Sequence, residues 1–273
     1  MLERPTFLLG MPRSGTTWLS QVFEAHPQSL VRLSPNFSYA LKDRLTIKSD
    51  RSTWMEVLEA AASSHDSFLT QDWRRERGDL PVHEGKEQAQ HLVIKDTRYF
   101  EIYRAGMERL PEARCLFVVR HPCATLHSWR TSAEFPTDAR FEEEWRGGAC
   151  RKGNGTGEYW GFDDWCEQTR LFLSLQEEDP ERYRVFSYEE VVRDPRPHLE
   201  ELFTFAGMEL REEVMDFVTL SHRRHEGDGY SVFKEPQHVL ERWRGSFPED
   251  VSSFITDSLA GTALEAYLGQ GNA

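Results

Sequence analysis

The start of the chain constrains the fold most, because a short apolar run at residues 7–9 leads straight into the glycine-containing loop GMPRSGTT at residues 10–17. Helical spacing of apolar residues begins directly after this loop. A strand, a glycine-containing loop and a helix in this order present backbone N–H groups and the positive end of the helix to a phosphate group. Gly10 and Gly15 allow the close approach and the unusual backbone angles that such a loop needs. We therefore expect a phosphate-binding loop at the start of an α/β fold.

Strand-like and helix-like segments alternate along the rest of the chain. The β-rich runs are residues 7–9, 30–33, 92–94, 115–119 and 183–186. The segments with helical spacing are residues 16–25, 53–62, 99–110, 124–131, 158–176, 198–206 and 212–220. Such alternation predicts a central parallel sheet flanked by helices. Because 273 residues is about the largest chain that one hydrophobic core serves, and no linker interrupts it, we expect a single domain over residues 1–273.

A second glycine-rich stretch, GGACRKGNGTG, occupies residues 147–157. Its glycine content disfavours both helix and strand, so we expect a mobile surface loop there. The loop either closes over a substrate as a lid or connects two elements passively.

Composition and charge limit the partners that the protein can have. The formal net charge of −13 repels nucleic acid and anionic lipid surfaces, so an anionic ligand must be held by a local cluster of cations. Cys115, Cys123, Cys150 and Cys166 lack the CxxC spacing of a zinc site and are too few for a disulfide framework, which predicts free thiols. No run is apolar enough for a transmembrane segment or a leader, and we expect a cytoplasmic protein.

The loop at residues 10–17 departs from the phosphate loop of nucleoside triphosphatases, GxxxxGK[ST]. Thr16 occupies the position of the lysine that reaches the terminal phosphates, and the cation lies inside the loop at Arg13. The run at residues 115–119 ends in Arg120, where many nucleotidases carry an aspartate for magnesium. These residues favour a ligand with fewer charges than a triphosphate and no bound metal.

Arg120 and Ser128 form a second candidate anion site. Pro122 suits the first turn of a helix, which places Arg120 at the carboxyl end of a strand and Ser128 two turns along the helix. Ligands bind open α/β sheets at the carboxyl ends of the strands, so both side chains can converge close to the first loop. A guanidinium group binds a phosphate monoester through two hydrogen bonds.

Together the two motifs resemble those of the sulfotransferases that use 3′-phosphoadenosine-5′-phosphosulfate (PAPS). Residues 12–18 are similar to the family's 5′-phosphosulfate loop, in the arginine-bearing form of the carbohydrate and protein-tyrosine branches. Arg120 with Ser128 matches its 3′-phosphate element, an arginine at a strand end and a serine eight positions later. The resemblance implies the P-loop NTPase-like sulfotransferase fold. It also implies transfer of a sulfuryl group from PAPS to a hydroxyl or amine of a small molecule, glycan or lipid, with adenosine 3′,5′-bisphosphate (PAP) as product and no metal requirement.

The resemblance assigns contacts with the nucleotide to further residues. Those within the loop are Arg13, Ser14, Gly15, Thr16 and Thr17, with hydroxyl donors at Ser14, Thr16 and Thr17. Tyr188 would lie against the adenine and Trp18 against its other face or edge, although both rings can equally be core packing. Near the C-terminus, Arg242 or Arg244 would close over the 3′-phosphate, and a basic helix end without a ligand is the alternative.

Catalysis by this family is expected to depend on electrostatic stabilisation. Charge that develops on the leaving 5′-phosphate can be absorbed by Arg13, by the N–H groups of the loop and by the helix N-terminus. By resemblance, Lys95 is a second contact to the sulfuryl oxygens; otherwise it is a surface lysine.

A general base is less evident, because Thr97 stands where the cytosolic branch has its histidine and no acid follows residues 26–27 as it does in the protein-tyrosine branch. Asp96 either takes a proton from the acceptor or caps the following helix. His83 and Glu84 lie in a polar segment that can fold over the acceptor or face the solvent. An amine or an ionised phenol needs no base.

Two other classes of protein stay open. A P-loop small-molecule kinase is disfavoured by Thr16 and Arg120, whereas a non-catalytic nucleotide-binding module is compatible with the absence of an obvious base. The sequence indicates neither the acceptor nor the oligomeric state.

Overall fold

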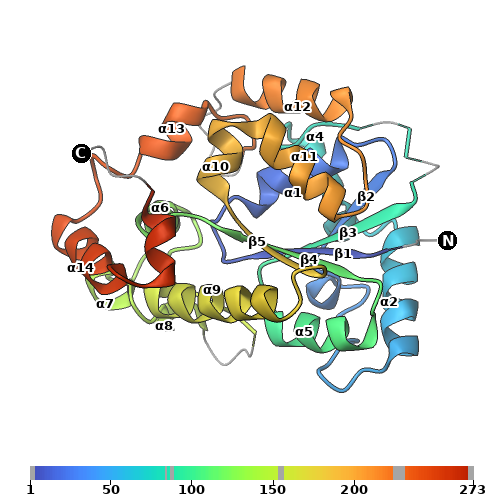
Figure 1. Ribbon diagram of the computed structural model, residues 1–273, viewed down its shortest axis with the longest axis horizontal. Helices are drawn as coiled ribbons and strands as arrows, with labels where there is room; N and C mark the ends of the chain where they lie inside the picture. The colour runs from blue at the N-terminus through green and yellow to red at the C-terminus, as the bar shows by residue number, and fades with distance from the viewer. Residues whose placement is uncertain (1–3, 84, 87–88, 153–156, 224–230, 270–273) are drawn as a thin grey trace.

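The protein forms one five-stranded parallel sheet in the order β2-β3-β1-β4-β5 (Figure 1). The computed structural model describes residues 4–83, 85–86, 89–152, 157–223 and 231–269. The strands are β1 (Thr6–Gly10), β2 (Ser29–Leu33), β3 (His91–Asp96), β4 (Arg114–Val119) and β5 (Tyr183–Ser187). Each strand contains one of the runs that the sequence predicted, so the α/β class with a central parallel sheet is confirmed.

Helices cover both faces of the sheet (Figure 1). One face carries α1 (Thr16–Glu24), α10 (Tyr188–Arg193), α11 (Pro195–Phe205) and α12 (Glu212–Arg223). The other carries α2 (Arg51–Ser63), α5 (Phe100–Arg109) and α9 (Gly161–Glu178), and α6 (Pro122–Arg130) and α14 (Glu249–Leu259) lie beyond the carboxyl ends of the strands, toward the left of the view.

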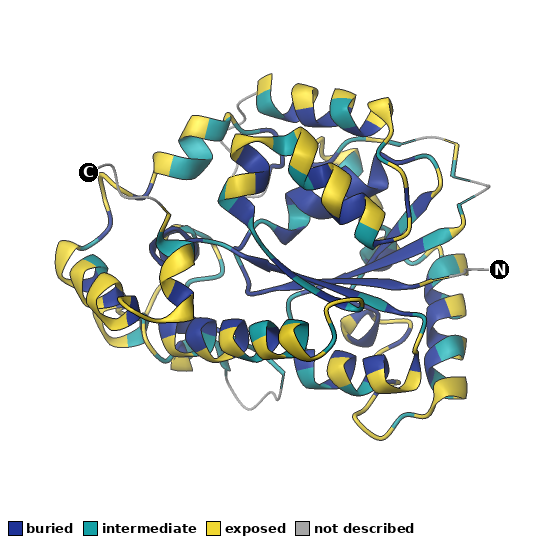
Figure 2. Ribbon diagram, viewed as in Figure 1, coloured by how far each residue is buried: buried dark blue, intermediate teal, exposed yellow. Residues whose placement is uncertain are grey.

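Alternation along the strands produces a hydrophobic core on each face. Phe7 and Leu9 belong to the core beneath α2, α5 and α9, whereas Leu8 between them belongs to the core beneath α1, α11 and α12. Both faces are therefore apolar, and the strands are buried along most of their length (Figure 2).

Shorter elements complete the chain, and the sequence predicted none of them. They are η1 (Pro35–Phe37), α3 (Ser67–Thr70), α4 (Asp72–Glu76), α7 (Phe141–Glu144), α8 (Ala149–Lys152), α13 (Pro236–Glu241) and η2 (Ala263–Leu268). None of the described helices combines the length and the apolar character needed to span a membrane. The four cysteines are free thiols.

The expectation of an irregular loop over residues 147–157 was wrong at its centre, where Ala149–Lys152 forms the single turn α8. The glycines flank this turn, and its own residues carry side chains that hold it in place. Lys152 pairs with Asp164 of α9 at 2.8 Å, and the N–H of Cys150 donates to Oε2 of Glu144 at 2.9 Å. The part of the predicted loop at residues 153–156 lies outside the described residues.

Candidate nucleotide-binding and catalytic site

The loop between β1 and α1 has the close-packed backbone that its glycines predicted. Gly15 precedes α1 with a φ of +92°, and a Cβ atom there would lie 2.3 Å from the ring of Tyr188. A Cβ on Gly10 would lie 2.6 Å from Val118 in the neighbouring strand. Arg13 also has a left-handed backbone, with a φ of 70°, which is rare for a residue with a side chain and is typical of functional sites.

A cavity of about 450 Å³ lies at the carboxyl ends of the strands. Residues at or just beyond the ends of all five strands line it, namely Pro12, Leu33, Lys95, Arg120 and Tyr188. This is where a parallel α/β sheet binds its ligands. Ten of the predicted site residues line the cavity: Arg13, Gly15, Thr16, Thr17, Trp18, Lys95, Arg120, Ser128, Tyr188 and Arg242.

Ser14 is an exception, because its hydroxyl donates to the carbonyl of Met11 and its N–H donates to the same oxygen at 3.1 Å. The side chain is buried and does not line the cavity. The expectation of a hydroxyl donor at Ser14 is therefore corrected: this residue fixes the shape of the loop, and the hydroxyl-bearing residues of the loop that line the cavity are Thr16 and Thr17.

The two predicted anion sites are contiguous. Nε of Arg13 donates to Oγ of Ser128 at 3.1 Å, and Nη1 of Arg120 donates to the carbonyl of Arg13 at 3.0 Å. Nη2 of Arg120 donates to the carbonyl of Val239 at 3.0 Å, which leaves other guanidinium N–H groups for a ligand. The arrangement can thus hold two anionic groups of one small molecule.

Glu189 positions Arg120, and the sequence did not predict this role. Its Oε1 lies 4.0 Å from Nε of Arg120, an atom that has no hydrogen-bond partner among the described residues. The same oxygen accepts from the N–H of His121 at 3.0 Å. Burial raises the pKa of Glu189, and the charge of Arg120 opposes that rise. The buried carboxylate therefore fixes the guanidinium from one side and leaves the cavity side to a ligand.

Trp18 and Tyr188 contact each other directly. Their ring centroids are 5.9 Å apart at an angle of 85°, and Nε1 of Trp18 donates to Oγ of Ser221 at 3.0 Å. The other ring contact of Trp18 is with His222, nearly parallel at 5.4 Å. Two rings in edge-to-face contact do not enclose a purine between parallel faces, so the geometry favours the edge contact that the sequence left open for Trp18.

Of the two C-terminal arginines, the structure favours Arg242. Arg242 follows α13 and lines the cavity, whereas the guanidinium of Arg244 lies over the ring of Trp243 at 5.1 Å. Trp243 in turn packs against His121 at 4.4 Å, just beyond the end of β4. The C-terminal segment is thereby held against the start of α6.

Lys95 and Asp96 are neighbours on β3, and their side chains point to opposite faces of the sheet. Lys95 lines the cavity, and burial lowers its pKa to about 8. Asp96 is fully buried: its Oδ1 accepts from Oγ of Ser34 at 2.8 Å and from the N–H of Thr97 at 2.7 Å, and its Oδ2 accepts from the hydroxyl of Tyr103 at 2.8 Å. Burial also raises the pKa of Asp96. The geometry therefore favours capping of the turn before α5, and the assignment of Asp96 as a base facing the acceptor is corrected.

His83, from the polar segment that was expected to fold over the acceptor, does not reach the cavity. The ring of His83 packs against Phe217 at 5.7 Å, and burial lowers its pKa to about 4, so it is neutral. His83 does not line the cavity, and Glu84 lies outside the described residues.

Several cavity residues were not predicted from the sequence. They are Phe68, Trp73, Arg74, Arg98, Glu134 and Trp160. An aromatic next to an arginine at residues 73–74 is a signal that could have been used, whereas nothing in the sequence around Glu134 marks it. The charges of Arg74, Arg98 and Glu134 act on Lys95 and affect its pKa, and we call the six residues together with Lys95 the acceptor side of the cavity.

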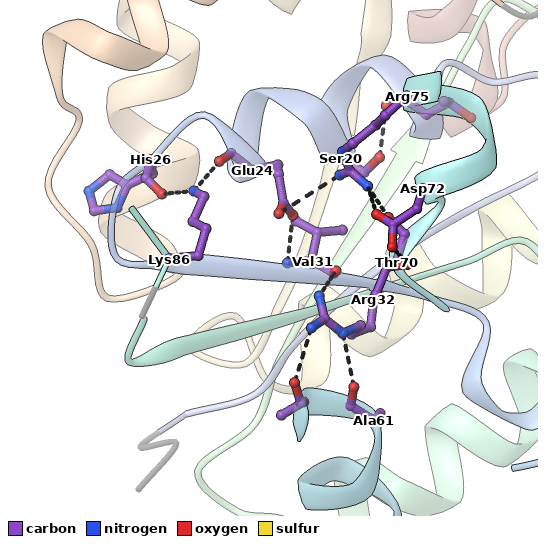
Figure 3. Close-up of polar contacts among 12 residues, drawn as sticks. Ser20, Glu24, His26, Val31, Arg32, Ala61, Thr70, Asp72, Arg75 and Lys86 are labelled. Atoms are coloured by element: carbon purple, nitrogen blue, oxygen red, sulfur yellow. Dashed lines mark hydrogen bonds and ion pairs between the residues drawn. The ribbon is translucent and has the colours of Figure 1, made fainter. Parts of the chain in front are cut away.

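The helix α4 that carries Trp73 and Arg74 is fixed by a buried ionic cluster (Figure 3). Glu24 of α1 accepts from the N–H of Val31 at 2.7 Å and lies 3.9 Å from the guanidinium of Arg75, the residue after Arg74. The ammonium of Lys86 donates to the carbonyls of Glu24 and His26. Burial raises the pKa of Glu24, and the cations of Lys86 and Arg75 oppose the rise. The cluster therefore ties α4 to α1 and to the edge strand β2.

The fold and the two contiguous anion sites define an α/β protein with a phosphate loop that lacks the lysine of the nucleoside triphosphatases. A family model described as the sulfotransferase family matches residues 5–212, and the chain belongs to this family. Human carbohydrate sulfotransferase 3 is 25% identical over 193 residues, which cover 67% of this chain and 40% of that protein. The chain thus matches less than half the length of that curated relative.

Solved structures agree on the fold. A mouse sulfotransferase complexed with PAP has a TM-score of 0.55 at 16% identity, covering 97% of this chain and 88% of the other. The sulfotransferase domain of an olefin synthase from Synechococcus has a TM-score of 0.53 at 19% identity, covering 94% of each chain. The expected P-loop NTPase-like sulfotransferase fold is therefore confirmed.

Proposed function

We propose that the protein transfers a sulfuryl group from PAPS to a hydroxyl or amine acceptor and releases PAP. The observation that carries this proposal is the contact between the two anion sites, in which Arg13 bonds to Ser128 and Arg120 bonds to the carbonyl of Arg13. PAP has two phosphate groups at the ends of one adenosine. Two adjoining cationic sites of different origin in the chain suit such a molecule, whereas a simple triphosphate site has a single loop with a lysine.

In this proposal, different residues contact the 3′-phosphate, the 5′-phosphate and the sulfuryl group. Arg120, Ser128 and Arg242 are placed for the 3′-phosphate, and the backbone N–H groups from Gly15 to Thr17 with Arg13 are placed for the 5′-phosphate. Fixed donors of this kind stabilise the charge that develops on a leaving phosphate. Lys95, protonated at neutral pH, is placed for the sulfuryl oxygens. Sulfuryl transfer then depends on positioning and charge stabilisation, as phosphoryl transfer does.

The likeness to a carbohydrate sulfotransferase and to structures that contain PAP supports the donor and suggests a glycan among the candidate acceptors. The test is calorimetry with PAP in the absence of magnesium, followed by radiolabelled PAPS and an acceptor panel. We expect tight PAP binding, weak Mg-ATP binding and transfer of label. Mg-ATP binding as tight as that of PAP would favour a kinase, and PAP binding without transfer would favour a non-catalytic module.

A further inference from the structure

Glu134 is a carboxylate in the cavity that no other residue engages. It follows α6, is half-buried, and lines the cavity on the acceptor side with Lys95, whose pKa its charge influences. Within the described ranges its side chain forms no hydrogen bond and no ion pair, and its backbone N–H donates to Oγ of Ser132 at 3.3 Å. A partly buried carboxylate of this kind is available to a ligand.

Among the described residues, three other acids near the cavity have partners of their own. The carboxylate of Asp96 accepts hydrogen bonds from the turn before α5 and from Tyr103. The carboxylate of Glu189 accepts from the N–H of His121 and pairs with Arg120. Glu158 pairs with Arg98 at 3.0 Å. Among the residues described, Glu134 is the single carboxylate that lines the cavity.

The histidines that line the cavity lie on the nucleotide side, apart from Lys95. His127 precedes Ser128 and contacts Oγ of Ser246 at 2.9 Å through Nε2, and His222 stacks on Trp18. His238 is adjacent to Val239, whose carbonyl binds Arg120. Lys95 is protonated at neutral pH, so it is a hydrogen-bond donor and cannot take a proton from the acceptor. Among the residues described, Glu134 is therefore the cavity group suited to take a proton from an acceptor close to Lys95.

We propose that Glu134 is the general base and that the acceptor is a neutral alcohol, such as the hydroxyl of a sugar. This assignment rests on the proposed function. The hydroxyl oxygen forms a bond to sulfur while the bond from sulfur to the 5′-phosphate oxygen breaks, and that electron pair stays on the leaving phosphate. The hydroxyl proton passes to the carboxylate of Glu134 and from there to solvent. An unprotonated amine or an ionised phenol has a free lone pair and attacks before any proton is lost, so a dedicated carboxylate favours an alcohol.

The aromatic side chains beside Glu134 are compatible with such an acceptor. Trp160, Phe68 and Trp73 line the same cavity as Glu134 and Lys95, and aromatic rings together with charged groups suit a molecule that has both an apolar face and hydroxyl groups. The carboxylate then supplies the directional contact to the reacting hydroxyl.

The test begins with wild-type protein, radiolabelled PAPS and matched alcohol and amine acceptors of the same carbon skeleton. We expect transfer to the alcohol. Glu134→Gln should lower kcat with that alcohol by about 10²-fold or more, the usual worth of a general base, and leave PAP affinity and acceptor KM unchanged. Glu134→Asp should recover part of the loss. Glu142→Gln, on α7 and outside the cavity, is the matched control and should behave as wild type.

A second readout separates a base from a structural contact. A fluorinated analogue of the same alcohol has a more acidic hydroxyl and depends less on a base, so the defect of Glu134→Gln should shrink with it. The assignment would be overturned if Glu134→Gln left kcat unchanged, or if it raised KM with a normal kcat. It would also be overturned if the defect did not depend on the acidity of the acceptor, or if the wild type transferred label to amines alone. In each of these cases the proposed function would stand. Failure of the wild type to transfer the label to any acceptor would overturn both.

Discussion

The nucleotide side and the acceptor side of the cavity are built in different ways. On the nucleotide side, the loop between β1 and α1 and the segment from Arg120 to Ser128 bond directly to each other through Arg13, and Tyr188 and Arg242 join them from later in the chain. On the acceptor side, residues come from α3, α4, the end of β3 and the segment after α6. The first side is held together by hydrogen bonds between its own residues, whereas the second depends on tertiary contacts made elsewhere, such as the cluster around Glu24. Binding of the nucleotide and choice of acceptor should therefore respond to separate sets of mutations.

The largest effect is expected from Arg13→Ala. Arg13 lies in the loop where leaving-group charge develops, and removal of a single preorganised donor of this kind usually lowers kcat by about 10²- to 10³-fold. Single-turnover transfer from radiolabelled PAPS measures the chemical step. An equal fall in PAP affinity with normal kcat would place Arg13 in ground-state binding and would exchange its role with that of Arg120.

Arg120→Ala should weaken PAP binding by about 1.5–3 kcal/mol, roughly 10- to 150-fold, since a charge-assisted contact to a phosphate is lost. Turnover at saturating PAPS should change far less. Arg244→Ala is the control, because this arginine lies over Trp243 outside the cavity lining, and calorimetry should show no loss. Similar losses for both variants would mean that net charge, rather than a specific contact, governs affinity.

The pH dependence of the transfer rate tests the role of Lys95 on the acceptor side. Its ammonium is present below its pKa and is lost above it, and burial lowers that pKa to about 8. The rate should therefore hold at neutral pH and decline as the pH rises through about 8, approaching tenfold per pH unit. Lys95→Arg keeps a charge at high pH and should remove the decline. A decline that persists in this variant would assign it to another group.

Glu24→Gln should have the smallest effect on chemistry and should act on the acceptor side alone. Loss of the buried carboxylate removes the partner of Arg75 and loosens α4, so acceptor KM should rise a few-fold while PAP affinity stays constant (Figure 3). Stability should fall by about 1–3 kcal/mol, measured by denaturant unfolding. Glu112→Gln breaks the exposed pair with Arg51 at 2.7 Å and should cost less than about 1 kcal/mol. A rise in the dissociation constant of PAP in Glu24→Gln would show that the two sides are coupled, and it would contradict the proposed separation.

The sequence predicted that Arg13 and the pair Arg120 and Ser128 converge, because each of the two motifs is a short local pattern. Spacing within a loop and along one helix fixes where Arg13 and Ser128 lie relative to their own strands, and the parallel order of β1 and β4 brings them together. The strands were predicted for the same reason, since each is a short apolar run between polar segments. The glycines around α8 led to the prediction of an irregular loop, whereas the helical turn there is stabilised by the ion pair between Lys152 and Asp164 of α9.

The acceptor side could not be predicted in the same way. Glu134 lies in an irregular segment without periodicity, and its place in the cavity follows from the path of the chain after α6. Asp96 was correctly placed at a strand end, but the pleat of β3 directs its carboxylate toward Tyr103 and directs Lys95 into the cavity. Neighbouring residues on a strand point to opposite faces of the sheet, and this alternation decides which of the two groups reaches the cavity.

The most direct measurement is a calorimetric comparison of PAP with adenosine 5′-monophosphate on the wild type and on Arg120→Ala, without magnesium. If the two anion sites hold the two ends of one nucleotide, the wild type should bind PAP much more tightly, and Arg120→Ala should lose that preference while its affinity for the monophosphate stays unchanged. Equal binding of both ligands by the wild type, or an equal loss for both in the variant, would contradict the account.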